Sequence, residues 1–324
     1  MRKIIQWMLV IGLAFAPVLS SAPAEAALSH TWVASTGSDS NNCDRPTPCA
    51  TFSGAYGKTA AEGEITCVDS GNYGGITITT SITINCENAI GSDTVSGGNN
   101  FNIFNITTPA GAAVVLRGLD FNALGAAGSS GQAVIMFNGA GVLHLHKVRI
   151  SYALGGAGGI FFNPNGAATL DISDSYITDN GTSGTGAGIY VKPASGIQAY
   201  VSINRTQIEN NYFGIVADGN QGGIINGTIS DSVVSGNIEN GITASTTSSN
   251  VLLLIDQTKV SGNIHGLVAG GSTAAMMVRN TTVTGNTAAG LFTVNGGALY
   301  SYGNNSVDGN NGNNGAFTGP ATLK

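Results

Sequence analysis

The sequence has few charged residues. Asp, Glu, Lys and Arg make up 9% of its 324 residues, where about 25% is usual. Acidic residues outnumber basic ones, 18 to 12, and the formal net charge is −6. Because an acidic surface repels polyanions, we expect no nucleic-acid partner and regard a strongly acidic polysaccharide as a less natural one.

Low charge together with 48 glycines raises the question of disorder. Disordered chains are usually highly charged and poor in β-branched residues. Here Val, Ile and Thr recur at regular positions along the chain. The composition therefore favours an ordered protein that is rich in short strands.

Long apolar runs are missing except near the N-terminus. Met1-Arg2-Lys3 precedes a mostly apolar, uncharged run over residues 4–19, and Ala24-Glu25-Ala26 follows it. This order predicts a signal peptide over residues 1–26, cleaved near Ala26, and a secreted or periplasmic product. An uncleaved membrane anchor is the alternative, although the run is short for one. We expect no membrane span in the mature form.

Cysteine is scarce, and all of it lies early in the mature chain, at Cys43, Cys49, Cys67 and Cys86. Export permits disulfides. Cys43 and Cys49 enclose a proline-containing loop. The phrases that end in Cys67 and Cys86 are alike, Ile-Thr-Cys and Ile-Asn-Cys, and if they stack in successive coils their Cα atoms lie about 4.8 Å apart.

The favoured connectivity is therefore 43 to 49 and 67 to 86, although the other pairings stay open. A metal site is the weaker alternative, because the sequence has neither a C-x-x-C motif nor a His near these cysteines. We predict no metal and no cofactor.

A repeated phrase dominates the rest of the chain. An apolar anchor is followed by another apolar residue five positions later and then by an Asn, and each repeat can bury its apolar edge only against its neighbours. Successive Asn residues are 31, 26, 26, 23 and 24 positions apart. The rows are Ile172, Ile177, Asn180; Ile203, Ile208, Asn211; Ile229, Val234, Asn237; Ile255, Val260, Asn263; Val278, Val283, Asn286; and Tyr302, Val307, Asn310, preceded by Leu116 with Phe121 and Leu145 with Ile150.

These rows predict an all-β fold, a single-stranded parallel β-helix of about ten coils. The spaced leucines and helical half of leucine-rich repeats are absent. Since an offset of five reverses strict strand alternation, a polar corner must lie between the two anchors. A second corner falls at the Asn column, where we expect left-handed backbone and amide bonds between coils. A Gly-apolar pair then starts a third strand.

The segment before the repeats differs from them. Thr51–Tyr56 and Thr59–Ala61 favour a short amphipathic helix with Phe52, Ala55, Tyr56 and Thr59 on one face. Such a helix would cover the open apolar end of the stack. We therefore divide the mature chain into an N-terminal loop and capping helix, 27–62, and a parallel β-helix with an irregular C-terminal end, 63–324.

The first coils resemble a known group. Gly63-Glu-Ile-Thr-Cys67-Val-Asp-Ser-Gly-Asn-Tyr73, Ile76-Thr-Ile78 and Ser81-Ile-Thr-Ile84 are similar to the opening of secreted bacterial right-handed β-helix proteins of the pectin-lyase-like superfamily. The resemblance covers nearly all of the mature chain. It implies a right-handed coil and keeps action on polysaccharides in view, but these motifs specify fold more than chemistry.

The catalytic signatures of that superfamily are missing. Its pectin hydrolases use an Asn-Thr-Asp triplet, an Asp pair, a Gly-His-Gly and an Arg-Ile-Lys. This chain has no adjacent Asp pair, and its only His-Gly, His265-Gly266, follows Ile264. Relatives that eliminate across uronic acids need a base and usually calcium held by several carboxylates. No compact set of that kind is visible.

The densest polar group lies around His144-Leu-His146. Strand alternation places His144 and His146 on one outward face, with Arg117 aligned to His146 one coil earlier and Asp171 aligned to His144 one coil later. A His beside a carboxylate can act as a general base, and Arg117 could hold a sugar carboxylate. These four residues are our candidate catalytic set. The alternative is a set of solvated strand residues that attract one another across coils.

Two other columns stand out. Phe161 and Tyr190 align side by side and face outward, so they are candidates for glycan stacking, the alternative being a cross-coil aromatic pair. A column of polar residues occupies the first corner, and we interpret it as a structural ladder that fixes coil register. Its members are Lys147, Asp174, Arg205, Asp231, Gln257, Asn280 and Asn304.

Two functions follow from these observations. The first is an exported β-helix that presents a rigid surface to a polysaccharide or a cell-envelope component, without a recognisable catalytic set. The second is a polysaccharide lyase or glycoside hydrolase with an unfamiliar site near His144 and His146. The sequence does not indicate an oligomeric state.

Overall fold

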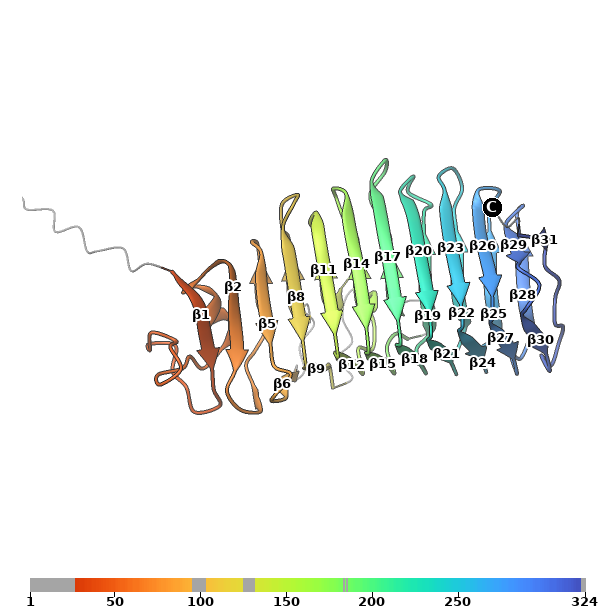
Figure 1. Ribbon diagram of the computed structural model, residues 1–324. Helices are drawn as coiled ribbons and strands as arrows, with labels where there is room; N and C mark the ends of the chain where they lie inside the picture. The colour runs from red at the N-terminus through yellow and green to blue at the C-terminus, as the bar shows by residue number, and fades with distance from the viewer. Residues whose placement is uncertain (1–26, 95–102, 125–131, 183, 185, 322–324) are drawn as a thin grey trace, which may run out of the picture.

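A computed structural model describes residues 27–94, 103–124, 132–182, 184 and 186–321 of the chain. The predicted signal peptide lies outside these residues. The chain winds into an elongated stack of coils, from the red N-terminal strand β1 to the blue strands at the far end (Figure 1). Within the part described, no helix is long and apolar enough to cross a membrane.

The chain forms three parallel sheets of 12, 10 and 9 strands, which we call sheets A, B and C, and each complete coil contributes one strand to each of them. Sheet A contains β1(Leu28–Val33), β2(Thr59–Cys67), β5(Ile82–Asn85), β8(Ala113–Arg117), β11(Gly141–His146), β14(Ala168–Ser173), β17(Gln198–Asn204), β20(Ile224–Ser230), β23(Val251–Asp256), β26(Ala274–Arg279), β29(Ala298–Ser301) and β31(Gly319–Pro320). Sheet B contains β3(Gly71–Asn72), β6(Gly91–Thr94), β9(Leu119–Asn122), β12(Arg149–Ser151), β15(Tyr176–Thr178), β18(Gln207–Glu209), β21(Val233–Ser235), β24(Lys259–Ser261), β27(Thr282–Thr284) and β30(Ser306–Asp308). Sheet C contains β4(Ile76–Ile78), β7(Phe104–Ile106), β10(Ala133–Phe137), β13(Gly158–Phe162), β16(Ala187–Val191), β19(Phe213–Asp218), β22(Asn240–Ser245), β25(His265–Gly270) and β28(Ala289–Val294).

The parallel β-helix prediction is confirmed. The smallest sheet has 9 strands, so the described coils number slightly fewer than the predicted ten or so. Both anchors of each row from Leu116 to Val283 point into one continuous core, as the fully buried Ile172 and Ile177 illustrate. Aromatic rings stack inside it, for example Phe137 on Phe162 with ring centroids 4.6 Å apart.

The corner between sheets A and B explains the odd spacing of the anchors. Asp174 lies between Ile172 and Ile177 and has left-handed backbone, with φ of 53°. One left-handed residue turns the chain sharply enough to send both anchors inward. The same conformation recurs at the aligned residues Lys147, Arg205, Asp231, Gln257 and Asn280.

The second corner carries the predicted amide ladder. The Nδ2 of Asn211 donates to Oδ1 of Asn237 over 3.2 Å, and that of Asn237 to Asn263 over 2.9 Å, while the backbone N–H of each Asn bonds the same acceptor. Our placement of left-handed backbone on the Asn itself was wrong. That conformation lies one residue earlier, at Asn210 and Gly236, because the Asn must turn its amide inward to meet its neighbours.

The last row is also displaced from its prediction. Val278 pairs with Ser301, not with Tyr302. Val307 still pairs with Val283. The final corner therefore contains one more residue than the preceding ones. Because we assumed the usual spacing of five, we predicted Tyr302 as the first anchor, whereas the residue in that position is Ser301.

The N-terminal end is closed by the helix α1(Phe52–Tyr56), as predicted. Phe52 is fully buried and its ring lies 5.3 Å from that of Tyr73 and 5.8 Å from that of Phe104. Thr59–Ala61, which we placed in this helix, instead begin β2. Residues expected to form only a loop provide β1, which pairs in parallel with β2 because Thr31 and Val33 alternate inward.

Both predicted disulfides are present. Cys43 bonds Cys49 and Cys67 bonds Cys86, with Cα separations of 4.7 and 4.9 Å. The second joins β2 to the residue that follows β5, since Ile65 pairs with Ile84 and brings the two phrases into register. The bonds staple the capping segment and the first two coils.

Candidate functional site

A row of outward side chains crosses sheet C. Phe161 on β13 pairs with Tyr190 on β16, Tyr190 pairs with Val216 on β19, and Val216 pairs with Thr243 on β22. Alternation turns their neighbours Ile160, Ile189, Ile215 and Ile242 into the core. The row is therefore held from beneath by packed aliphatic side chains, which keep its members at the strand spacing of about 4.8 Å.

The two aromatic residues singled out from sequence lie side by side in this row. Their ring centroids are 5.4 Å apart and their planes are inclined by 49°. Both side chains are half-buried. Phe213, at the start of β19, adds a third half-buried ring to the same surface.

A second row runs beside the aromatic one and carries the charge. Asp218 ends β19, and its side chain is only 9% exposed. Its Oδ2 accepts a hydrogen bond of 2.9 Å from the Tyr190 hydroxyl and lies 3.5 Å from the Lys192 ammonium. Its Oδ1 accepts from the backbone N–H of Asn220 over 2.9 Å. Both carboxylate oxygens are thus occupied.

The tyrosine that donates to Asp218 is strongly affected by its surroundings. Burial of Tyr190, followed by the charge and the hydrogen bond of Asp218, raises the pKa of its hydroxyl. Tyr190 therefore stays protonated and remains a donor to the carboxylate at every ordinary pH. Lys192 also lies 5.8 Å from the centre of the Tyr190 ring, within the range of a cation–π contact.

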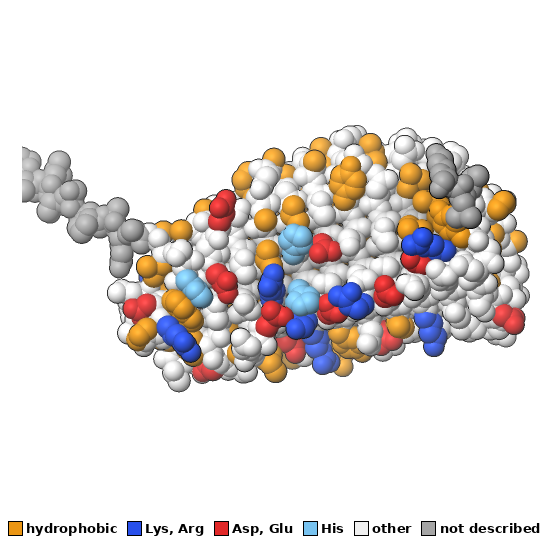
Figure 2. Space-filling view, in the orientation of Figure 1, with side chains coloured by type: hydrophobic (Ala, Val, Ile, Leu, Met, Phe, Trp, Pro, Cys, Tyr) orange, Lys and Arg blue, Asp and Glu red, His pale blue; other side chains and the backbone are white. Residues whose placement is uncertain are grey.

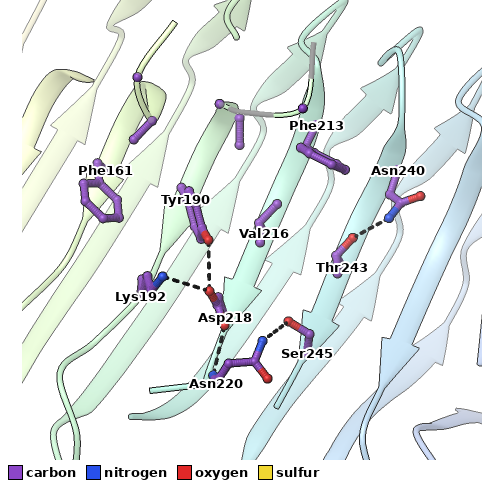
Figure 3. Close-up of a pocket in the computed structure, with 15 residues that line it drawn as sticks. Phe161, Tyr190, Lys192, Phe213, Val216, Asp218, Asn220, Asn240, Thr243 and Ser245 are labelled. Atoms are coloured by element: carbon purple, nitrogen blue, oxygen red, sulfur yellow. Dashed lines mark hydrogen bonds and ion pairs between the residues drawn. The ribbon is translucent and has the colours of Figure 1, made fainter. Parts of the chain in front are cut away.

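Together these rows line a groove of about 560 Å³, which we call the aromatic groove (Figure 3). On its β22 side, Asn240 Nδ2 donates to Thr243 Oγ1 over 3.2 Å, and Asn220 Nδ2 donates to Ser245 Oγ over the same distance. An apolar floor with a few placed polar groups is the usual character of a ligand site.

The candidate catalytic set lies on sheet A. His144 pairs with Asp171 and His146 pairs with Arg117, as the alignment predicted. His144 Nδ1 lies 3.1 Å from Asp171 Oδ2, and the two side chains are 43% and 38% exposed. All four residues line a shallow hollow of about 440 Å³. Figure 2 shows His, basic and acidic side chains gathered in the middle of this face.

Glu87 joins this group from a distant part of the sequence. Its Oε1 lies 3.4 Å from His146 Nε2 and 3.0 Å from Lys147 Nζ. A hydrogen bond from Lys147 lowers the pKa of Glu87. The intervening corner residue is Gly118, where a Cβ would meet the Glu87 nitrogen at 2.6 Å, so only glycine lets the coils approach this closely. We call Arg117, His144, His146, Asp171 and Glu87 the histidine cluster.

The charged corner column continues from the cluster. His146 Nδ1 lies 3.4 Å from Asp174 Oδ2, and Arg205 Nε donates to Asp174 Oδ1 over 2.7 Å. The hydrogen bonds from Arg205 lower the pKa of Asp174. The column therefore pairs charges across coils, the geometry that its interpretation as a structural ladder requires.

No set of three or more His, Cys, Asp and Glu side chains among residues 27–94, 103–124, 132–182, 184 and 186–321 is placed to hold a metal ion. The structure thus brings together the four predicted catalytic residues on sheet A and the two predicted aromatic residues on sheet C. Their roles stay predictions.

Sequence reasoning missed Lys192, Phe213 and Asp218 in the aromatic groove and Glu87 in the histidine cluster. A signal for the charged pair was available, because extending the register places Lys192 beside Asp218 on adjacent coils. Glu87 gave none, since it contacts a residue 60 positions away by reaching across a glycine. Such a contact depends on the shape of the corner.

Comparison with known proteins identified the fold. Neither protein-family models nor curated protein sequences gave a match. Among solved structures, a pectate lyase matches with a TM-score of 0.50 and 15% identity, over 84% of this chain and 67% of its own. The periplasmic alginate epimerase AlgG matches with a TM-score of 0.43 and 13% identity, over 75% and 64%. The A-module of a mannuronan C-5 epimerase from Azotobacter vinelandii matches with a TM-score of 0.39 and 12% identity, over 81% and 89%.

The first likeness, added to the three-sheet topology, defines the class. The chain is a right-handed parallel β-helix protein of the pectin-lyase-like fold. An identity this low concerns the fold alone, since one scaffold carries many functions.

Proposed function

We propose that this protein is an exported β-helix that binds glycan chains in the aromatic groove of sheet C. The observation that carries the proposal is the placement of Phe161 and Tyr190 in one row, with half-buried rings 5.4 Å apart. Ring faces of this kind can pack against the apolar faces of sugar rings. Asn, Ser and Thr side chains beside them supply hydrogen bonds for hydroxyl groups.

Rigidity supports the same proposal. The row stands on fully or almost fully buried isoleucines, and its strands belong to a continuous parallel sheet. A site that is ordered before binding loses little conformational entropy when a ligand arrives. One fold relative is a pectate lyase, which makes carbohydrate a reasonable ligand class to test.

A binding experiment tests this proposal. Titration calorimetry against a panel of neutral and uronic oligosaccharides should find ligands for the wild-type protein. Phe161→Ala combined with Tyr190→Ala should weaken binding at least about tenfold, since each ring contributes of the order of 1 kcal/mol. Tyr200→Ala is the matched control, because Tyr200 is a 50% exposed tyrosine on sheet A. Equal affinity in the wild type and the double variant would contradict the proposal.

Cleavage of a polysaccharide at the histidine cluster is the second candidate. It is favoured by the arrangement of Arg117, His144, His146 and Asp171 around one hollow. His144, oriented by Asp171, would act as a base, and Arg117 would hold a sugar carboxylate. Release of unsaturated or reducing ends that disappears in His144→Ala and in His146→Ala, while groove binding persists, would support this function. No release from any tested polymer would exclude it.

Export is part of the proposal. The two disulfides are of the kind that persists in oxidising compartments. N-terminal sequencing of protein recovered from the periplasm or the medium should begin at Ala27. Recovery from the cytosol with residues 1–26 intact would contradict export.

A further inference from the structure

We propose that the aromatic groove selects uncharged glycans and rejects anionic ones. This inference rests on the proposed function, because it names the ligand class of the same site. The groove contains one acidic side chain, Asp218, and one basic side chain, Lys192. The sugars that the groove accepts depend on how these two charges are arranged.

Among the described residues that line the groove, Lys192 is the only Lys or Arg. It is therefore the one lining group that could pair with a carboxylate or sulfate on a sugar. Its ammonium already lies 3.5 Å from Asp218 Oδ2, and its side chain is 26% exposed. The single positive charge of the site is thus neutralised before any ligand binds.

Asp218 cannot move away easily. Three donors hold it: the Tyr190 hydroxyl, the Lys192 ammonium and the Asn220 backbone N–H. A buried carboxylate that loses such partners incurs a large desolvation cost, so this one stays in place. A sugar carboxylate that approached Lys192 would then face a second carboxylate at short range.

The other lining side chains are uncharged. Phe161, Phe213 and Val216 are apolar, while Asn220, Asn240, Thr243 and Ser245 carry amides and hydroxyls. These groups complement sugar hydroxyls, which both donate and accept hydrogen bonds. The net charge of the whole chain, −6, adds long-range repulsion of polyanions.

Burial strengthens this selectivity. Asp218 is 9% exposed, so water screens it less than it screens the carboxylates on the surface of sheet A. The Tyr190–Asp218–Lys192 group therefore acts as a specificity determinant, because it supplies hydrogen bonds to a neutral ligand and repulsion to a charged one.

The experiment uses ligands that differ only in charge. Oligogalacturonate and oligomannuronate are each compared with the same oligosaccharide after carboxyl reduction, next to the neutral members of the glycan panel. Wild-type protein should bind neutral ligands at least about tenfold more tightly than their uronic counterparts at low salt. This binding should disappear in the Phe161→Ala, Tyr190→Ala double variant.

Asp218→Asn then tests the cause. Tyr190 and the Asn220 N–H donate to different oxygens of Asp218, so the single amide oxygen of the variant keeps the bond from the Asn220 N–H while its amide nitrogen faces the Tyr190 hydroxyl, which can accept from it. Lys192 then becomes an unpaired cation. We expect affinity for the uronic ligands to rise about tenfold, and this gain to vanish at 0.5 M salt. Lys192→Gln alone should not produce the gain, and circular dichroism should show that both variants keep the β-helix.

The outcomes separate the two proposals. Tighter binding of uronic ligands by the wild type, lost in the aromatic double variant, would overturn this inference and leave the proposed function intact. An unchanged preference in folded Asp218→Asn would also overturn it. Absence of binding to every glycan would overturn the proposed function and this inference with it.

Discussion

The aromatic groove and the histidine cluster occupy two outer faces of one scaffold, but the first is lined mainly by apolar and uncharged polar side chains and the second mainly by ionisable ones. The groove has ring faces, amides and one internally neutralised ion pair. The cluster has two imidazoles, an arginine and two carboxylates around a shallow hollow. Both stand on parallel strands over the same core. The backbone therefore gives both faces the same regular support, and the side chains at outward positions decide what each can bind.

The two faces also differ in how far water reaches their charges. The Asp218 side chain is 9% exposed, whereas that of Asp171 is 38% exposed. Coulomb interactions weaken as exposure to water increases. Removing a hydrogen-bond or ion-pair partner should therefore lower the free energy of unfolding more in the groove than in the cluster. This difference can be measured.

The largest expected effect lies in the amide ladder, at the corner that leads from sheet B into sheet C. Asn237→Ala removes the acceptor that serves both the N–H and the side-chain amide of Asn211. Each buried group left without a partner costs about 1–3 kcal/mol, so the free energy of unfolding should fall by about 2–4 kcal/mol. Urea titration measures the change.

The control for this prediction is Asn226→Ala, which removes a half-buried Asn from the outer face of β20. It should change the free energy of unfolding by less than about 0.5 kcal/mol. If the two substitutions lowered the free energy of unfolding equally, the amide ladder would contribute no more to stability than an Asn on the outer face.

A smaller effect should separate the groove from the cluster directly. Tyr190→Phe keeps the ring but removes the hydrogen bond to Asp218, and we expect a loss of about 1–2 kcal/mol in the free energy of unfolding because the acceptor is charged and buried. Ser173→Ala removes the hydroxyl that lies 3.0 Å from His146 Nδ1 in the more exposed cluster. It should cost less than about 0.5 kcal/mol. If Ser173→Ala lowered the free energy of unfolding more than Tyr190→Phe, polar contacts would be stronger in the exposed cluster than in the groove, which contradicts the prediction.

The smallest effect concerns pH. The pKa values of Glu87 and Asp174 are lowered by Lys147 and Arg205 respectively. The folded state therefore binds protons less readily than the unfolded state, so this contribution to stability is fully present above the ordinary pKa values of 4.5 and 3.8 and is lost as pH falls through the lowered ones. Because the pairs lie at the surface, we expect less than about 1 kcal/mol.

Urea unfolding of the wild type and of Glu87→Gln combined with Asp174→Asn, at pH 6 and at pH 3, measures this contribution. The difference between the two proteins should be present at pH 6 and should shrink at pH 3. A difference that grows on acidification would show that the charges oppose folding.

Much of the fold was predictable because residues at the same position in successive repeats pair on adjacent strands. The anchors from Leu116 to Val278 pair as aligned. The Cys67–Cys86 disulfide follows from two matching phrases, and the Cys43–Cys49 disulfide from the short loop that these residues enclose. The errors concern corners. Neither the extra residue before Val307 nor the left-handed position before each Asn changes the hydrophobic pattern, so spacing alone could not reveal them.

The candidate sites show the same division. Alignment of rows brought His144 beside Asp171 and Phe161 beside Tyr190, because parallel pairing converts aligned positions into contacts. It did not reveal that Asp218 is nearly buried while bonded to Tyr190 and Lys192, or that Glu87 reaches across Gly118 to Lys147. Burial and reach depend on how corners and loops close over the strands.

By itself the sequence determined the coil and, for the rows from Leu116 to Val283, the register and the residues that share each column, because regularly spaced apolar anchors align in a parallel stack. The tertiary structure alone decided which column became a groove and which stayed an open, charged face. The physical reason is that a groove needs neighbouring loops and side chains of different lengths to leave a space between them. That space, and the burial of the carboxylate within it, are properties of several coils together and of no single repeat.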